Sequence, residues 1–105
     1  MALIYNKIAI IGMGMIGASI ALASRRAGLA TVLAGYDADS TAMLDVAALQ
    51  LVDEVATSAA AAVTDADLVI MAVPVGAVGT VAETIVSHMK PGAVLTDTGS
   101  TKRSV

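Results

Sequence analysis

One stretch near the start of the chain constrains the fold more than any other part of the sequence. Residues 7–17 read KIAIIGMGMIG, an apolar run rich in branched side chains followed at once by a complete G-x-G-x-x-G pattern. Such a run is typical of a strand that is buried on both faces of a parallel sheet. Apolar residues then recur at helical spacing until Gly28, which provides a stop signal. The sequence therefore predicts a strand over about 7–11, a glycine loop, and a helix over about 15–27.

The three glycines of this pattern have separate roles in a loop that binds a dinucleotide. Gly12 lets the strand turn sharply, Gly14 leaves the backbone open to a pyrophosphate, and Gly17 lets the helix pack close to the strand. The N–H groups at the start of the helix would face the phosphates, where the helix dipole favours negative charge. Because a strand precedes the loop and a helix follows it, the pattern stands in the context that a dinucleotide site requires.

Other interpretations of the same stretch are weaker. Residues 8–23 resemble the apolar core of a signal peptide, but only Lys7 precedes them as a basic residue and three glycines interrupt them. A membrane helix needs about 20 apolar residues, and the polar residues 24–26 end the run too early. A P-loop needs Gly-Lys followed by Ser or Thr, whereas Ala18 follows the last glycine here.

The composition fits one small domain and excludes several kinds of function. Apolar residues make up 57 % of the 105 residues but include no Phe or Trp, so the core must consist of small aliphatic side chains. The net charge is −3 and no basic stripe is present, so we expect no nucleic-acid partner and no membrane partner. The absence of cysteine excludes disulfides and thiolate metal sites, and the single histidine excludes a histidine cluster. We expect no metal and a cytoplasmic location.

The remainder of the chain alternates between strand and helix patterns. Strands are predicted at about 31–36, 52–57, 68–73 and 93–96, and helices at about 40–49, 58–63 and 74–89, with another helix starting after Asp97. Such alternation is typical of a parallel sheet with helices on both faces. We predict the α/β class, with a Rossmann-type doubly wound parallel sheet of about five strands. Because the usual dinucleotide-binding sheet has six strands, we expect a domain over residues 1–105 that is truncated at its C-terminus.

Asp37 is the second strong signal for a dinucleotide. It ends the predicted second strand, where an acidic side chain accepts hydrogen bonds from the adenosine ribose and repels a 2′-phosphate. The alternative is an ordinary turn aspartate just before Asp39. No Lys or Arg occurs between Ala27 and Met89, so no cation is available near this strand end for the extra phosphate of NADP. We therefore predict NAD as the cofactor.

Two further segments end at the same edge of the predicted sheet. Val73 and Pro74 follow one strand, and Ser100 and Lys102 follow the last one, at the edge where doubly wound folds bind ligands. On local physics alone Ser100 is as well explained as a helix N-cap. His88, the only histidine, is rejected as a catalytic base because it is predicted in the last turn of a helix, at the opposite edge of the sheet.

Taken together, these motifs resemble the N-terminal domain of the prephenate dehydrogenases. The resemblance looks closest to the broad-specificity cyclohexadienyl (prephenate/arogenate) dehydrogenases of bacteria. It rests on IIGMGMIGASIA, Gly35-Tyr36-Asp37, ADLVIMAVPVGAVG and TDTGSTK, and covers almost the whole chain. The last segment, Asp-x-Gly-Ser-x-Lys after Ala-Val-Pro-Val at this spacing, is far more distinctive than the glycine loop.

The resemblance implies an NAD-dependent dehydrogenase of tyrosine biosynthesis. In this family, NAD(P) accepts a hydride from the ring of prephenate or arogenate as the ring loses its carboxylate. The implied cofactor contacts are Gly12, Met13, Gly14, Met15, Ile16, Gly17, Asp37, Val73 and Pro74. Ser100 matches the active-site serine, beside the ring hydroxyl and the nicotinamide. The family's catalytic histidine and helical second domain come after the position of Val105, so we expect this chain alone to be inactive and the full-length protein to be a homodimer.

Two other functions stay open on the sequence alone. Another Rossmann dehydrogenase, of the β-hydroxyacid dehydrogenase or pyrroline-carboxylate reductase type, shares the glycine loop and the Val-Pro turn but not Gly-Ser-x-Lys. A non-catalytic nucleotide-sensing domain needs the loop and Asp37, but it gives no reason for Ser100 and Lys102.

Overall fold

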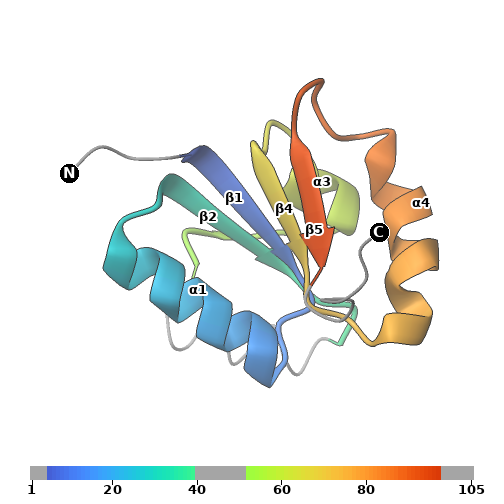
Figure 1. The fold of residues 1–105 in the computed structure, drawn as a ribbon, viewed down its shortest axis with the longest axis horizontal. Coiled ribbons are helices and arrows are strands. Elements are labelled where there is room, and N and C mark those ends of the chain that lie inside the picture. The colour runs from blue at the N-terminus through green and yellow to red at the C-terminus, as the bar shows by residue number, and fades with distance from the viewer. Residues whose placement is uncertain (1–4, 40–51, 98–105) are drawn as a thin grey trace.

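The apolar run predicted as the first strand lies at the centre of the fold (Figure 1). The computed structural model describes residues 5–39 and 52–97 of the chain. The strands are β1 (Tyr5–Ile11), β2 (Ala30–Tyr36), β3 (Glu54–Val55), β4 (Leu68–Met71) and β5 (Val94–Asp97). The helices are α1 (Met15–Ala27), α3 (Ala59–Val63) and α4 (Val78–Val86), with a 3-10 turn, η1 (Val75–Ala77), directly before α4.

The strands form one parallel sheet in the order β3-β2-β1-β4-β5. The chain leaves β1 through β2 to β3 and then crosses over to add β4 and β5 on the other side of β1. Ile11 pairs with both Tyr36 of β2 and Met71 of β4, so these three strands end at the same edge. The reversal of strand order beside β1 produces a crevice at this carboxyl edge, where doubly wound sheets bind ligands. The predicted Rossmann-type α/β fold with five strands is confirmed.

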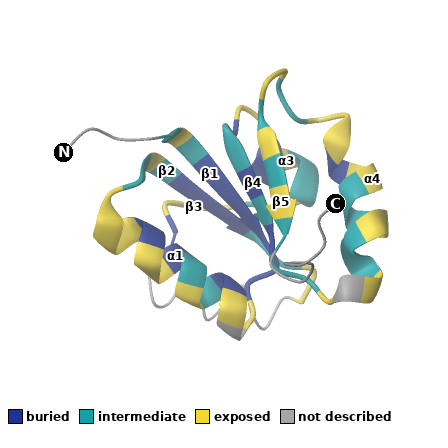
Figure 2. Ribbon diagram, in the orientation of Figure 1, coloured by how far each residue is buried: buried dark blue, intermediate teal, exposed yellow. Residues whose placement is uncertain are grey.

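Two apolar cores lie on opposite faces of the sheet, because successive side chains of a strand point to opposite sides. Ala9 and Ile11 belong to the core under α3 and α4, whereas Ile8 and Ile10 belong to the core under α1. All four residues are 3 % exposed or less, and Figure 2 shows the buried colour running along the central strands. The carboxyl end of β1, which leads into the glycine loop, is therefore fixed from both faces.

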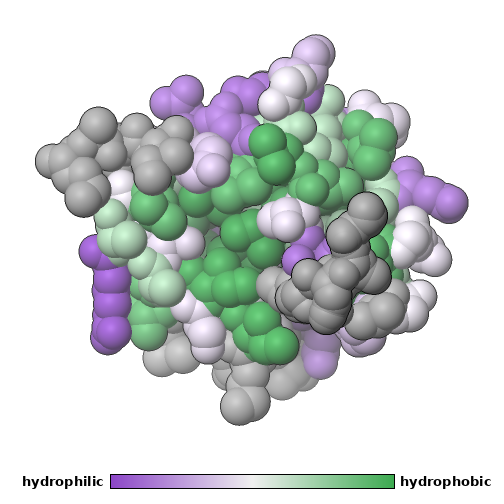
Figure 3. Space-filling model, in the orientation of Figure 1, coloured by the Kyte–Doolittle hydropathy of each residue, from purple (hydrophilic) through white to green (hydrophobic). Residues whose placement is uncertain are grey.

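The face that carries α1 is less well covered beyond β1. Leu68 and Ile70 of β4 are partly buried against the α1-side core, and Val94 of the edge strand β5 is 54 % exposed. Figure 3 shows apolar surface gathered in the middle of this face. Among residues 5–39 and 52–97, α1 is the helix on this side of the sheet, and it packs over β1 and β2.

Helix α1 begins and ends where the sequence predicts. Gly28 has φ +65°, a left-handed conformation that glycine adopts without strain. Its N–H donates to the carbonyl oxygen of Arg25, and the N–H of Leu29 donates to that of Ser24, so the last carbonyls of the helix are satisfied. The stop signal read from the sequence is confirmed as a glycine C-cap.

The helix predicted over 74–89 is shorter and more irregular than expected. It begins with η1, in which the N–H of Ala77 donates to the carbonyl oxygen of Pro74 (2.8 Å), and α4 then ends at Val86. Gly76 and Gly79 explain the poor first turn, since glycine weakens a helix by about 1 kcal/mol relative to alanine. The preceding strand also stops at Met71 instead of residue 73.

The third strand is reduced to two residues, although six were predicted. The N–H of Asp53 donates to the carbonyl oxygen of Leu33, and the N–H of Leu33 donates to the Asp53 carboxylate, both at 2.8 Å. A side chain thus takes the place of a backbone partner, and regular pairing begins only at Glu54. The helices predicted at 40–49 and after Asp97 lie outside the described residues. Within the described ranges, no helix is long and apolar enough to cross a membrane.

Candidate functional site

The glycine loop is folded so tightly that two of its positions have no room for a side chain. Gly12 has φ +99°, and a Cβ on it would lie 2.4 Å from the carbonyl oxygen of Ala72. A Cβ on Gly17 would lie 1.9 Å from the carbonyl oxygen of Gly12. Both obstacles are backbone atoms, which cannot turn aside as a flexible side chain can. This geometry fits the predicted roles of the two glycines, a sharp turn and a close contact between helix and strand.

Gly14 differs from the other two because its missing side chain leaves open space. It is the N-cap of α1, in an extended conformation, and within the described chain no heavy atom beyond its own neighbours lies within 4 Å of a Cβ built there. It makes no side-chain cap hydrogen bond, so within the described residues no cap side chain occupies the first N–H groups of the helix, which can bind a ligand or water. Bare backbone, free N–H groups and the positive end of the helix dipole together suit a phosphate.

Asp37 connects the end of β2 to the glycine loop. Its Oδ2 accepts a hydrogen bond from the N–H of Met13 (2.7 Å), and its Oδ1 accepts one from the N–H of Asp39 (2.7 Å). The N–H of Gly12 donates to the carbonyl oxygen of Tyr36 (2.7 Å), which holds the same two segments together through the backbone. Each carboxylate oxygen keeps a lone pair after these bonds. The side chain is therefore fixed in place and can still accept hydrogen bonds from a ligand's hydroxyl groups.

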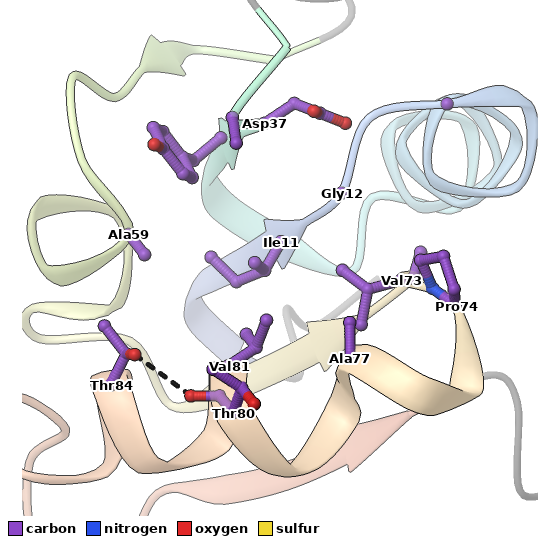
Figure 4. Close-up of a pocket in the computed structure, with 14 residues that line it drawn as sticks. Ile11, Gly12, Asp37, Ala59, Val73, Pro74, Ala77, Thr80, Val81 and Thr84 are labelled. Atoms are coloured by element: carbon purple, nitrogen blue, oxygen red, sulfur yellow. Dashed lines mark hydrogen bonds between the residues drawn. The ribbon is translucent and has the colours of Figure 1, made fainter.

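A cavity of about 540 Å³ opens at this carboxyl edge (Figure 4). Its volume lies in the range typical of small-molecule sites. The walls come from the glycine loop, the end of β2, the start of α3, and the segment that runs from Ala72 through most of α4. The lining is mostly apolar, and Asp37 is the one carboxylate among the lining residues in the described part of the chain.

The cavity brings together five of the residues predicted to contact a cofactor: Gly12, Gly14, Asp37, Val73 and Pro74. Met13, also expected to contact the cofactor, donates its N–H to Asp37 and does not line the cavity; its side chain is 4 % exposed and packs into the α1-side core. Ile16 is 60 % exposed and does not line the cavity, while Met15 and Gly17 belong to the first turn of α1. Ser100, predicted as the catalytic residue, lies outside the described residues.

Six lining residues were not predicted from the sequence. They are Tyr36, Ala59, Ala77, Thr80, Val81 and Thr84, besides the backbone-adjacent Ile11, Ala38 and Ala72. Four of the six lie at positions 77, 80, 81 and 84, which is the spacing of one helix face. That periodicity was present in the sequence and, combined with the position of Pro74 at the strand end, was a signal that this face borders the ligand crevice.

The charged groups of the described residues gather mainly at the opposite, amino edge of the sheet. Lys90 forms an ion pair with Asp67, whose Oδ2 also accepts from the N–H of Asn6 (2.6 Å) and of Lys7 (3.2 Å). The hydrogen bond from Lys90 lowers the pKa of Asp67 below its ordinary value, and the two backbone bonds lower it further. These contacts tie the strand starts together. Among the described residues, no group of three His, Asp or Glu side chains is placed to hold a metal ion.

His88 lies beyond the end of α4 and is not a lining residue of the cavity. Its N–H donates to the carbonyl oxygen of Ile85 (2.9 Å) in the turn that follows the helix. The prediction put it in the last turn of a longer helix, so the helix end was placed a few residues too late. Within the described structure, His88 takes no part in the cavity, in line with its rejection as a catalytic base.

Comparison with known proteins agrees with this geometry. The family profile described as "Prephenate dehydrogenase, nucleotide-binding domain" matches residues 20–105. A cyclohexadienyl dehydrogenase of Zymomonas mobilis is 38 % identical over 102 residues, which are 97 % of this chain and 35 % of that protein. The prephenate dehydrogenase of A. aeolicus, solved with hydroxyphenyl propionate and NAD+, superposes with a TM-score of 0.82 at 26 % identity, covering 92 % of this chain and 34 % of that one.

An arogenate dehydrogenase from Synechocystis is similarly close in structure. It superposes with a TM-score of 0.80 at 31 % identity, covering 90 % of this chain and 33 % of that chain. The chain thus spans about a third of the length of the relatives that it matches.

Proposed function

The chain belongs to the prephenate dehydrogenase family as its nucleotide-binding domain, and on that premise we propose that it binds NAD for the oxidative decarboxylation of prephenate or arogenate. In this reaction, a ring hydrogen leaves as hydride to the nicotinamide while the ring carboxylate leaves as carbon dioxide. The product is 4-hydroxyphenylpyruvate from prephenate and tyrosine from arogenate. Bound NAD would supply the hydride acceptor, and the residues of this chain would hold and orient the NAD.

The observation that carries the proposal is the Asp37 carboxylate, held beside an open glycine loop. Its two oxygens are fixed by the N–H groups of Met13 and Asp39 and keep lone pairs for a ribose diol. Gly14 offers the bare backbone on which a pyrophosphate fits. Val73 and Pro74, which follow β4, also line the cavity. The residues present therefore fit a dinucleotide that is bound across the end of β1.

Preference for NAD over NADP follows from charge. A 2′-phosphate on the adenosine ribose would lie beside Asp37, and the chain has no Lys or Arg between Ala27 and Met89 to neutralise it. Two unit charges at about 4 Å repel by about 4 kcal/mol when the surroundings screen as they do near a protein surface. Even a fraction of that energy gives a preference of at least tenfold.

Titration of the intact protein with NADH and NADPH tests this proposal. We expect NADH to bind at least ten times more tightly, and Asp37→Ser to reduce the ratio mainly by weakening NADH. Asp39→Ser is the matched control, because it removes the same charge two residues away at a position that does not line the cavity. Equal affinities for the two cofactors in the unaltered protein would contradict the argument from Asp37.

Ser100 is proposed as the catalytic residue that hydrogen-bonds near the ring hydroxyl and the nicotinamide. The support is its match to the family motif Asp-x-Gly-Ser-x-Lys directly after β5, whose last residue, Asp97, pairs with Met71 at the carboxyl edge. Ser100→Ala in the intact protein should lower kcat with prephenate or arogenate far more than it lowers NADH affinity. A β-hydroxyacid dehydrogenase would instead oxidise a hydroxyacid and leave both cyclohexadiene substrates untouched, and a nucleotide sensor would lose nothing on this substitution.

The family also supports two wider expectations for the whole protein. We propose a homodimer formed through parts that this domain does not contain, and a cytoplasmic location in keeping with a biosynthetic dehydrogenase. Sedimentation of the intact protein tests the first, and a monomer at micromolar concentration would contradict it.

A further inference from the structure

One face of α4, together with the N-cap residue Ala77, forms a continuous wall of the cavity. Ala77, Thr80, Val81 and Thr84 all line it, and the helix runs away from the carboxyl edge at which Pro74 lies. With a rise of 1.5 Å per residue, Thr84 lies about 10 Å along the helix from Ala77. Figure 4 shows Thr84 and Ala59 at the end of the cavity that is farthest from Pro74. The cavity is therefore deeper than a phosphate site needs and has a distinct far end.

The far end of the cavity is the place for a base if the proposed dinucleotide binds. Its phosphates belong at Gly14 and its adenosine ribose at Asp37. The base is attached to the ribose on the side away from the phosphates, so it extends between the wall of α4 and the start of α3. Val81 and Ala59 offer apolar surface to the flat faces of the base, and Thr80 and Thr84 place hydroxyl groups on the same wall.

The hydrogen of the Thr84 hydroxyl group is already used in a hydrogen bond within the helix. It donates its hydrogen to the carbonyl oxygen of Thr80, one helical turn earlier, at 3.0 Å. A hydroxyl has one hydrogen and two lone pairs, so with this bond made Thr84 offers only acceptors to a ligand. An amino group on the base is satisfied by such an acceptor, whereas a carbonyl group on the base is not.

We infer that Thr84 is a base-specificity residue that selects adenine over hypoxanthine through the exocyclic amino group. This inference rests on the proposed binding of NAD. Hypoxanthine has a carbonyl oxygen where adenine has its amino group, so two acceptors face each other unless Thr84 gives up its bond to Thr80. One lost hydrogen bond at a site partly open to water weakens binding about tenfold.

The test compares NAD with its deamino analogue, nicotinamide hypoxanthine dinucleotide, by calorimetric titration of the intact protein. The unaltered protein should bind the deamino analogue about ten times more weakly than NAD. Thr84→Val keeps the shape of the side chain and removes the hydroxyl, so NAD should weaken until the two ligands bind within about twofold of each other. Thr84→Ser restores the hydroxyl and should restore the preference.

Thr64→Val is the matched control for the local helix bond. Thr64 donates to the carbonyl oxygen of Ala60 (2.8 Å) in the same way at the end of α3, but it does not line the cavity. This variant should leave both affinities unchanged. The inference is overturned if the unaltered protein binds both ligands equally, if Thr84→Val keeps the preference, or if Thr80→Val alone abolishes it. A failure of NAD to bind at all would instead overturn the proposed function, and the inference with it.

Discussion

Gly14→Ala and Gly17→Ala should separate ligand binding from folding within one loop. The two glycines lie three residues apart in the same motif, and both would receive the same methyl group. The methyl group on Gly14 enters open space in front of α1, whereas the one on Gly17 lies 1.9 Å from the carbonyl oxygen of Gly12. We expect Gly14→Ala to weaken NADH binding with little change in stability, and Gly17→Ala to destabilise the fold itself.

The expected magnitudes follow from these surroundings. At Gly14 the loss of a favourable N-cap residue costs up to about 1 kcal/mol, and the smaller freedom of the unfolded chain offsets part of it. Binding should weaken at least tenfold, because a methyl group at the phosphate position removes one or more charge-assisted hydrogen bonds of about 1.5–3 kcal/mol each. At Gly17 the overlap is with backbone, so the cost should reach about 3 kcal/mol or more, or about 10–20 °C in Tm for a domain of this size.

Two measurements on each variant decide the matter. Thermal unfolding followed by circular dichroism gives the Tm, and titration with NADH well below the Tm gives the Kd. The reasoning is refuted if Gly14→Ala binds NADH like the unaltered protein, or if Gly17→Ala keeps its Tm. If Gly14→Ala lost as much stability as Gly17→Ala, the conclusion that a methyl group on Gly14 enters open space would be contradicted.

Further predictions concern the contacts that hold the sheet edges. Because Lys90 and two backbone N–H groups lower the pKa of Asp67, its contribution to stability is present above the ordinary carboxyl pKa and is lost as pH falls through the lowered one. The difference in unfolding free energy between the unaltered protein and Asp67→Asn should therefore be largest near neutral pH and should shrink in acid; a constant difference in urea unfolding from pH 7 to pH 3 would contradict this. Asp53→Ala should cost about 1–2 kcal/mol, because it leaves the part-buried N–H of Leu33 without its partner. Arg25→Ala, which removes only the exposed ion pair with Asp53, should cost well under 1 kcal/mol in the same experiment.

The parts of the fold predicted to within a residue or two are those specified by local signals. The strand, loop and helix from Tyr5 to Ala27 depend on an apolar run, three glycines at fixed spacing, and a glycine C-cap, all of which act through neighbours in the chain. The short α3 was also predicted, from its alanine-rich sequence, and the structure adds a cap in which the Oγ of Ser58 accepts from the N–H of Ala61. Such local signals are nearly sufficient to predict the secondary structure of the segment that contains them.

The errors occur where the outcome depends on distant residues. β3 is short because the Asp53 carboxylate accepts a hydrogen bond from the N–H of Leu33, twenty residues away in sequence, in place of a backbone carbonyl group. No local sequence pattern predicts this bond. The extent of the cavity along α4 was missed for a related reason. The spacing of residues 77, 80, 81 and 84 marks one face of the helix, but whether that face meets a ligand depends on how α4 packs against α3 and the sheet.

The role of Asp37 depends both on a local sequence signal and on a contact with a residue distant in the sequence. The sequence predicts a ribose-binding carboxylate, but the structure adds that this carboxylate also holds the N–H of Met13 and so shapes the glycine loop before any ligand arrives. A variant at this position therefore alters two properties at once, and a weaker Kd by itself does not show which. The ratio of NADH to NADPH affinity separates them: a distorted loop weakens both cofactors alike, whereas loss of the ribose contact and of the negative charge weakens NADH and favours NADPH. The ratio, and not the affinity, is the quantity that reports on the role of Asp37.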